Sequence, residues 1–372
     1  MKLRRGRFHD GAEDGFEPLV PLDVTSTTTF REMLEQMSRT AFGARRLGEA
    51  YEVLCAMVDD PDCQIIVTLS GAMTVAKMGL VLVEMIQRGM AHFIVSTGAL
   101  MAHGLAESVG GTHYKYRGEM DDETLYRLGY DRVYDTLELE KNLYDSAEII
   151  REAYRSLDPT RPFASFELHR EIGRILVEKG LVPSILGAAY QKGVPVYVPA
   201  FTDSELGLEV AVAAIQSEYR PGKEADLDAL FAPVPNFNPF LDLYDFAKRL
   251  VRAKRIGIFT IGGGVPRNWG QEMGPFVEIL NDMLGADLPV PRIHYGVRIC
   301  PEPVHWGGLS GCTYSEGVSW GKFVPPSEGG PLRRGLLGRH DRLAAVDPRR
   351  YRTSGGIVAA YGTFHRPVSR TL

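Results

Sequence analysis

Short apolar runs alternate with longer amphipathic stretches along most of the chain. The apolar runs predict strands, at residues 65–70, 92–98, 195–203 (with the loop that follows) and 255–261. Apolar residues at helical spacing predict helices at about 74–90, 165–176, 205–216 and 241–252, and Ser165 is expected to cap the second of these. Strands separated by helices of this length indicate an α/β fold with a doubly wound, mostly parallel sheet.

The chain shows no internal repeat and no low-complexity linker, so a single domain is predicted. Residues 51–324 hold the pattern of strands and helices. Residues 1–50 are expected to form an amino-terminal extension with a helical segment, and residues 325–372 an atypical tail. Residues 220–240 contain several prolines, and we expect them to form a surface loop and not a domain boundary.

Composition is that of an ordinary globular protein, with 44% hydrophobic residues and a net charge of −5. This charge does not indicate a nucleic-acid partner, and no apolar run is long enough to predict a membrane span. The four cysteines lack C-x-x-C spacing, which fits reduced thiols in a cytoplasm and not a structural zinc site. His92, His113 and His169 also lack metal-ligand spacing and are expected to be core or surface residues.

Glycines and small polar residues follow each predicted strand, where ligands of doubly wound sheets bind. These strand ends are Ser70-Gly71, Ser96-Thr97-Gly98, Thr202-Asp203 and Gly262-Gly263-Gly264. Glycines let the backbone approach a pyrophosphate, although the triple glycine is not a G-x-G-x-x-G fingerprint. Asp203 suits either a ribose hydroxyl or amine ligand, or the cap of the helix that follows. Together the four ends predict a nucleotide cofactor without identifying it.

One lysine stands beside an aromatic residue and a carboxylate near the carboxyl end. Residues 315–323 read Ser-Glu-Gly-Val-Ser-Trp-Gly-Lys-Phe. A lysine amine attacks a carbonyl or imine only when neutral, so it must be partly desolvated or held beside a base. Trp320 can provide the apolar wall, and Glu316 can bind an amine or take its proton. A surface turn with a solvated Lys322 is the alternative.

The same stretch resembles the active-site segment of deoxyhypusine synthases, whose catalytic lysine lies in the frame Glu-x-x-x-Trp-Gly-Lys. The resemblance runs from about residue 65 to 324. It implies NAD as the cofactor and a homotetramer with active sites at a dimer interface. It also implies that spermidine is oxidised by hydride transfer, that 1,3-diaminopropane leaves, and that the 4-aminobutyl fragment passes from a lysine imine to an acceptor amine.

Roles carry over from this resemblance to residues of this chain. Lys322 would hold the imine, while Glu316 and Trp320 would bind the polyamine. The cofactor contacts implied by the resemblance are Ser70, Thr74, Thr97, Gly98, Asp203, Gly262 and Gly263. A pocket of low dielectric constant would keep the lysine neutral and exclude the water that hydrolyses an imine.

The chain also departs from the family's eukaryotic members at polar positions of the site. Asn268 stands where those members carry a histidine that contacts spermidine, and His103 replaces a glutamate. Apolar residues replace acidic ones at three places: Leu208, Trp306 and Leu309. We therefore expect the same chemistry in a more apolar channel, with Asn268 and His103 among the substrate-binding residues.

The pattern resembles the bacterial branch of the family, which favours a small diamine as the acceptor. With putrescine, transfer of the aminobutyl group would form homospermidine. Two alternatives stay open: modification of a protein lysine, and an inactive relative that still binds NAD or a polyamine.

The tail does not resemble the family's carboxyl end. From Pro331 onward it has nine arginines and no lysine. A reading frame shifted by one nucleotide permits codons for Ser-Asp-Ala-Thr-Ile-Val-Trp-Pro-Leu, which is similar to the missing end. The hypothesis is a frameshift near Gly330, and the coding DNA tests it.

Overall fold

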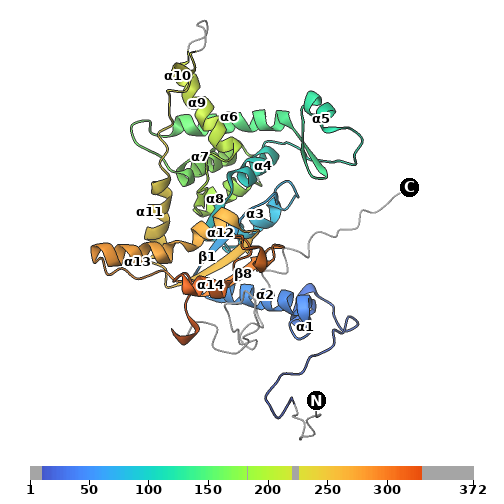
Figure 1. Ribbon diagram of the computed structural model, residues 1–372. Helices are drawn as coiled ribbons and strands as arrows, with labels where there is room; N and C mark the ends of the chain where they lie inside the picture. Colours follow the sequence, from blue (N-terminus) through green and yellow to red (C-terminus); the bar gives the residue numbers. More distant parts are fainter. Residues whose placement is uncertain (1–10, 182, 220–225, 329–372) are drawn as a thin grey trace, which may run out of the picture. The chain divides into compact units, whose positions relative to one another are not determined.

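The computed structural model describes residues 11–181, 183–219 and 226–328 (Figure 1). Their contacts divide them into two compact units that meet in the sequence between Asp59 and Asp60, and each is described by itself. The tail beyond Glu328, including the predicted frameshift near Gly330, lies outside the described residues. Among the described helices, none combines the length and the apolar character that crossing a membrane requires.

The first unit contains two helices, α1 (Phe30–Met37) and α2 (Phe42–Asp59). Leu34 of α1 packs against Tyr51 and Cys55 of α2, so the apolar faces of the two helices bury each other. A capping box begins α1, because Thr29 and Glu32 each accept a hydrogen bond from the other's backbone N–H.

A five-stranded parallel sheet forms the centre of the second unit and confirms the predicted α/β fold. Its strands are β1 (Cys63–Leu69), β2 (Phe93–Ser96), β6 (Val196–Tyr197), β7 (Arg255–Ile261) and β8 (Tyr295–Ile299). They lie in the order β6-β2-β1-β7-β8, and every pair in this sheet is parallel. Strands buried on both faces explain why the sequence shows continuous apolar runs and not alternation.

The strand order places a topological switch point at the centre of the sheet. From β1 the chain moves outward through β2 to β6, then returns to add β7 and β8 on the other side of β1. The loops after β1 and β7 therefore leave in opposite directions and open a crevice beyond the carboxyl ends of these two strands. Ligands of doubly wound sheets bind at such a crevice.

Helices connect the strands and cover the sheet. They are α3 (Gly79–Gln87), α4 (Gly98–Ser108), α5 (Asp122–Leu128), α6 (Glu140–Ser156), α7 (Ser165–Glu178), α8 (Ile185–Lys192), α9 (Glu205–Glu218), α10 (Leu227–Leu230), α11 (Pro239–Leu250), α12 (Gly264–Gln271), α13 (Met273–Leu284) and α14 (Tyr314–Ser319), with 3₁₀ turns at Val304–Trp306 and Pro326–Glu328. Helix α12 packs on β1 and β2, and α7 packs on β6. Phe246, Tyr197 and Phe323 belong to the core that these helices close over the sheet.

A small antiparallel sheet stands beside α5 and was absent from the sequence prediction (Figure 1). It consists of β3 (Tyr114–Lys115), β4 (Tyr130–Val133) and β5 (Thr136–Leu139), in the order β3-β5-β4. Its strands have only two to four residues, which is too short for a periodic pattern. The sheet matters because β5 brings Glu138 to helix α4.

Two sequence predictions were wrong in detail. The helix expected from residue 74 begins at Gly79, because residues 72–78 form a separate helical turn that ends with Lys77 at a left-handed φ of 63°. Ser165 does not cap α7: Ala164 is the N-cap, and the Ser165 hydroxyl accepts a hydrogen bond from Val198 N. The carboxylate of Asp242 instead accepts the first free N–H groups of α7.

Candidate active site

The loops after β1 and β7 touch at the central crevice. Ser70 N donates to Ile261 O over 3.0 Å, and Gly263 N donates to the Ser70 hydroxyl over 2.7 Å. Gly262 has a φ of 87°, and a Cβ there would lie 2.2 Å from Ser70 Oγ. Only glycine suits this position, and the backbone at the crevice is left bare for a ligand to approach.

A third loop closes on the glycine turn. Ser310 Oγ accepts a hydrogen bond from Gly264 N at 2.9 Å, and a Cβ on Gly263 would lie 2.4 Å from the Ser310 Cβ. Arg267 holds this loop, because its guanidinium donates at 2.6 Å to each of Leu309 O and Cys312 O. Sequence analysis missed Arg267, since an arginine that is only 2% exposed is rare and no local pattern marks it.

The loops after β2 and β6 also meet. Thr97 is the N-cap of α4, and a Cβ on the next residue, Gly98, would lie 2.1 Å from Ser204 Oγ. Ser204 is the N-cap of α9, so the alternative of Asp203 as the cap is not what the structure shows. Asp203 is exposed, and its carboxylate makes no hydrogen bond with any described residue, which leaves it open to a ligand.

Thr74 differs from the other predicted cofactor residues. It is fully buried, and its hydroxyl donates to Leu100 O of α4 over 3.0 Å. In this structure Thr74 therefore ties the loop after β1 to α4, and its hydroxyl does not face an open space.

Lys322 lies in a nearly buried position at the end of α14, with 9% of its surface exposed. Its Nζ is 2.9 Å from Glu272 Oε1 and 3.0 Å from Asn268 Oδ1. The Nζ also lies 5.9 Å from the centroid of the Trp320 ring. The structure thus brings three predicted residues together, and adds Glu272, which sequence analysis missed.

Helix α12 explains why Asn268 and Glu272 reach the same amine. The two residues are four apart along a helical segment, so their side chains project from one face. This helix begins at Gly264, within the glycine turn after β7. Helix α12, together with Glu272 at its C-cap, thereby supplies a wall of the crevice and the two oxygen atoms that contact Lys322. The spacing from Asn268 to Glu272 was the signal that could have pointed to Glu272.

Glu316 takes a different place from the one expected. Its Oε2 accepts hydrogen bonds from Thr313 N at 2.8 Å and from the Thr313 hydroxyl at 3.0 Å, which forms the capping box of α14. The hydrogen bonds from Thr313 lower the pKa of Glu316. Within the described residues, Glu316 makes no ion pair or hydrogen bond with Lys322. Its predicted contact with the polyamine stays a prediction.

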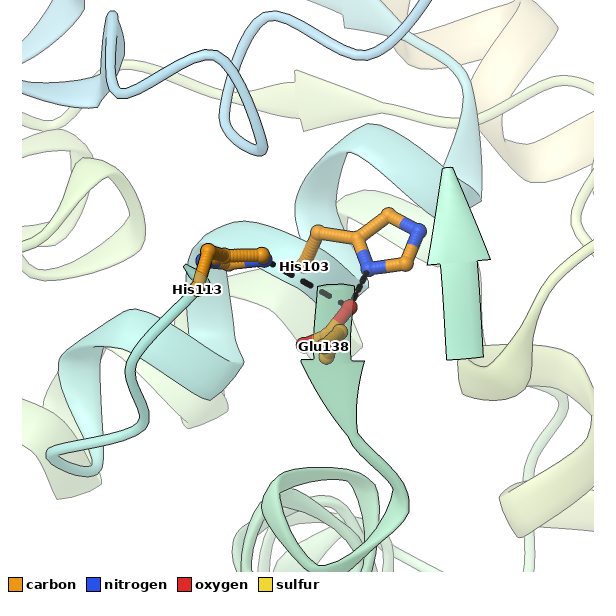
Figure 2. Close-up of side chains that lie close together, drawn as sticks. All are labelled: His103, His113 and Glu138. Carbon is orange, nitrogen blue, oxygen red and sulfur yellow. Dashed lines mark hydrogen bonds and ion pairs between the residues drawn. The ribbon is translucent and has the colours of Figure 1, made fainter. Parts of the chain in front are cut away.

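His103 lies on helix α4 and makes no hydrogen bond or ion pair with Lys322 among the described residues. Its Nδ1 is 2.5 Å from Glu138 Oε2 of β5 (Figure 2). His92 and His169 serve the core: His92 Nδ1 accepts from Ile65 N, and burial lowers the pKa of His169 to about 4. The third, His113, lies close to Glu138 and is not an isolated core residue.

The fold and the site define a doubly wound α/β protein with a nearly buried lysine held by the helix that begins in the glycine turn of the crevice. The sequence model of the family named Deoxyhypusine synthase matches residues 32–329. The chain belongs to this family.

Relatives of known name agree with this assignment. The chain is 32% identical over 308 residues to "Probable deoxyhypusine synthase 2" of Methanosarcina mazei, covering 82% of this chain and 83% of the relative. It is equally 32% identical over 308 residues to "Deoxyhypusine synthase-like protein" of Chlorobaculum tepidum, with 82% of each chain covered. The match to the family model, residues 32–329, includes Lys322 and its neighbours Asn268 and Glu272.

Proposed function

We propose that the protein is an NAD-dependent transferase that moves the 4-aminobutyl group of spermidine to an acceptor amine. The observation that carries the proposal is Lys322, nearly buried, with a carboxylate oxygen of Glu272 at 2.9 Å. The membership in the deoxyhypusine synthase family and the glycine-lined crevice support it.

The crevice suits a dinucleotide. Gly262 and Gly263 leave backbone where any Cβ would collide with Ser70 or Ser310, and Gly98 does the same against Ser204. Exposed Asp203 offers a carboxylate for a ribose hydroxyl. When bound, NAD would accept the hydride that converts the donor amine into an imine.

Lys322 would then act as the nucleophile. Glu272 is placed to take the proton of its ammonium, which frees the lone pair. The neutral amine adds to the imine carbon of the oxidised donor. The bond from that carbon to 1,3-diaminopropane breaks, the diamine leaves with a proton, and the aminobutyl fragment is left on Lys322 as an imine. Asn268 Oδ1 holds the lysine nitrogen in line through these steps.

We propose a small diamine such as putrescine as the acceptor, ahead of a protein lysine. The apolar residues Leu309 and Trp306 support this choice, because they stand on the loop beside the glycine turn where eukaryotic members of the family are acidic. They are 53% and 70% exposed. An amine of putrescine would displace Lys322 from the aminobutyl fragment, and the resulting imine would be reduced by the hydride taken earlier from the donor, which gives homospermidine.

A homotetramer with sites at a dimer interface is part of the same proposal. Trp320 is 67% exposed although it stands beside the lysine. Trp306, Leu309 and Leu208 are also exposed apolar side chains. A second copy of the chain that covered these residues would supply the dry surroundings that an imine needs.

The test is incubation of the purified protein with NAD and spermidine, followed by measurement of 1,3-diaminopropane. We expect release, and an adduct on Lys322 after borohydride reduction. Lys322→Arg should abolish both, whereas Lys248→Arg, at an exposed position on α11, should leave both unchanged. Added putrescine or an acceptor protein then distinguishes the two products. Binding of NAD without release or adduct would instead identify an inactive relative.

A further inference from the structure

A buried carboxylate joins two histidines outside the Lys322 group. Glu138 of β5 is 1% exposed, and its Oε2 lies 2.5 Å from His103 Nδ1 and 3.5 Å from His113 Nε2 (Figure 2). The partners come from three segments, since His103 is on α4 and His113 precedes β3. Two imidazole rings lie close to the same buried carboxylate oxygen. The nitrogen that carries the proton on each ring therefore decides how the ring interacts with Glu138.

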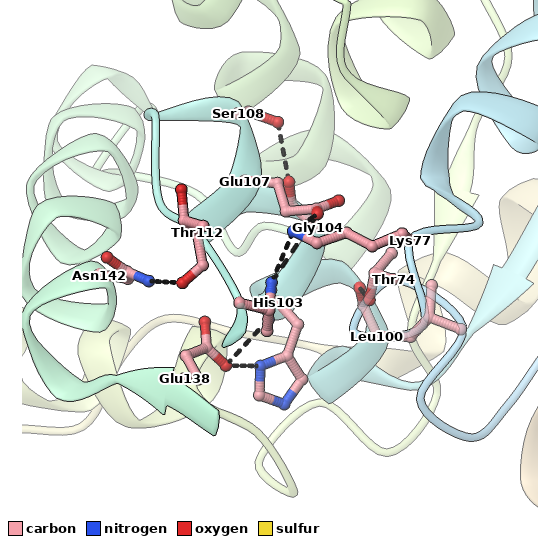
Figure 3. Close-up of polar contacts among 11 residues, drawn as sticks. Thr74, Lys77, Leu100, His103, Gly104, Glu107, Ser108, Thr112, Glu138 and Asn142 are labelled. Carbon is pink, nitrogen blue, oxygen red and sulfur yellow. Dashed lines mark hydrogen bonds and ion pairs between the residues drawn. The ribbon is translucent and has the colours of Figure 1, made fainter. Parts of the chain in front are cut away.

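Lys77 extends this group on the far side of His113. Its Nζ lies 3.0 Å from His113 Nδ1. It also forms an ion pair with Glu107 of α4 (Figure 3). The backbone of Lys77 is left-handed, a conformation that costs a residue with a Cβ about 1–2 kcal/mol. The end of the helical turn at 72–78 thus holds this lysine in a conformation that residues with a Cβ rarely adopt.

The contact with Lys77 determines where the proton of His113 lies. An ammonium group has donors only, so His113 Nδ1 must accept. Burial lowers the pKa of His113, and with Nδ1 as acceptor the neutral ring carries its proton on Nε2. Nε2 lies 3.5 Å from Glu138 Oε2 and makes no hydrogen bond with the described residues.

The same arrangement argues against a bound metal. The donor atoms of His103, His113 and Glu138 lie within 4.8 Å of one another, a spacing that a metal ion could occupy. However, a protonated His113 Nε2 has no lone pair to offer. At 2.5 Å, His103 Nδ1 is within hydrogen-bond distance of Glu138 Oε2, which leaves this carboxylate oxygen engaged by an N–H donor. The cluster is therefore better suited to hold a proton than a metal.

Glu138 consequently orients His103. With the proton on Nδ1 directed to Glu138, the other ring nitrogen, Nε2, carries the lone pair and makes no hydrogen bond with the described residues. Figure 2 shows this second nitrogen on the side of the ring turned away from Glu138. The hydrogen bond to Glu138 raises the pKa of His103, and the charges of Glu205 and Asp131 act in the same direction.

His103 is also close to two of the predicted cofactor loops. Helix α4 begins at Gly98, whose backbone packs against Ser204, and Glu205 is the next residue. One oxygen of Glu205, Oε2, is buried without a hydrogen-bond partner among the described residues. The carboxylates that face His103 thus come from β4, β5 and α9, and together they suit a cationic ligand.

We propose that Glu138 positions His103 as the proton acceptor for an ammonium group of the substrate. Nε2 of His103 takes one proton from the ammonium, which leaves a neutral amine and an imidazolium stabilised by Glu138. His113 and Lys77 are positioning residues that fix the carboxylate. The identity of the substrate as a polyamine rests on the proposed function, but the geometry of the proton acceptor does not.

The first test is a proton NMR titration of the histidine ring signals, with His103→Gln to assign His103. In the wild type, His103 should titrate above the ordinary 6.5. In Glu138→Gln its pKa should fall by about one unit or more, because the charged partner is gone. Glu148→Gln, at an exposed position of α6, should change nothing. A wild-type value at or below 6.5 overturns the proposal even if Glu138→Gln does not fold.

The second test uses ligands. Spermidine should lower the pKa of His103, since a nearby cation disfavours the imidazolium, and this readout needs no turnover. If diaminopropane release is observed, its kcat/KM should rise with pH through the pKa of His103, and in Glu138→Gln that limb should move to lower pH. If the proposed function is wrong, no rate profile can be measured, but the NMR titration still tests the role of His103. Stoichiometric Zn²⁺ held by the wild type and lost in His103→Gln would overturn the proposal.

Discussion

The nitrogen of Lys322 has two oxygen neighbours of different chemistry. Asn268 Oδ1 at 3.0 Å only accepts a hydrogen bond, whereas Glu272 Oε1 at 2.9 Å also takes a proton. Under the proposed mechanism we therefore expect the reactivity of the lysine to depend on Glu272, which stands 50 positions earlier in the chain.

Replacement of Glu272 by glutamine tests this role. The amide keeps the size and one acceptor oxygen but cannot take the lysine proton, so we expect imine formation to slow by about 100-fold at neutral pH. The rate is followed as borohydride-trapped adduct by mass spectrometry. Glu218→Gln, an exposed change on α9, is the control. Equal rates in the two variants would exclude Glu272 as the proton acceptor.

At the scale of elements, the turn after β7 depends on the absence of side chains. Gly263 has an ordinary extended φ of 173°, so backbone strain does not explain the glycine; its contact with Ser310 does. An alanine at position 263 would displace either the loop that Arg267 holds or the glycine turn itself.

We therefore expect Gly263→Ala to weaken NAD binding by about tenfold or more, because such overpacking costs about 1–3 kcal/mol. Fluorescence titration with NADH measures the affinity. Gly43→Ala on α2, where a Cβ meets nothing within 4 Å, serves as the matched control. An unchanged affinity in a folded Gly263→Ala protein would mean that the turn is not part of the cofactor site.

The start of α7 gives the protein an unusual response to pH. Burial raises the pKa of Asp242 to about 7, although it accepts N–H groups of Ser165 and Phe166 at 3.1 Å each. Its ordinary pKa is 3.8, so between these values the folded chain binds the proton that the unfolded chain has lost. This group therefore lowers the stability as pH rises from about 4 to 7.

Asp242→Asn removes this titration and retains one acceptor oxygen. Between pH 5 and pH 8, the variant should gain about 2–3 kcal/mol of unfolding free energy relative to the wild type. Urea unfolding at the two pH values measures the difference. Asp282→Asn, an exposed change on α13, should track the wild type. A constant difference between variant and wild type would show that Asp242 does not titrate in this range.

Sequence patterns predicted long elements well and short ones poorly. Strand β7 has the predicted bounds, since seven consecutive residues span the buried centre of the sheet. Within the predicted strand and loop at 195–203, strand β6 takes only two residues, and β8 was not predicted. Helix α7 was found, but its cap was not, because Asp242 reaches it from 77 positions away. Contacts between distant segments leave no periodic signal in the chain.

At the scale of the whole molecule, the exposed aromatic and aliphatic side chains beside the site bear on how copies of the chain assemble. Trp306, Trp320 and Leu309 stand on one loop and helix and are each more than half exposed. We expect sedimentation to give four times the chain mass of 41.2 kDa. Trp306→Glu should shift the protein toward smaller species by placing a charge in an apolar interface. A monomer at micromolar concentration would contradict the tetramer.

Some residues of the site could be predicted from the sequence and others could not, for a physical reason. Trp320 and Lys322 are neighbours in sequence, so one motif names both. Arg267 and Glu138 are buried, and their hydrogen-bond partners lie on segments that come together only when the chain folds. No local pattern in the sequence therefore marks either residue. The resemblance pointed to His103 but not to its carboxylate partner, because Glu138 lies on a short strand of a second sheet.

Helix α12 has a consequence for the order of events. Helix α12, with Glu272 as its C-cap, joins the bare glycines to the two side chains that hold Lys322. Under the proposed function, a dinucleotide that displaced the glycine turn would also displace Asn268 and Glu272, and with them the surroundings of the amine. We therefore expect the dinucleotide to bind first and the polyamine second.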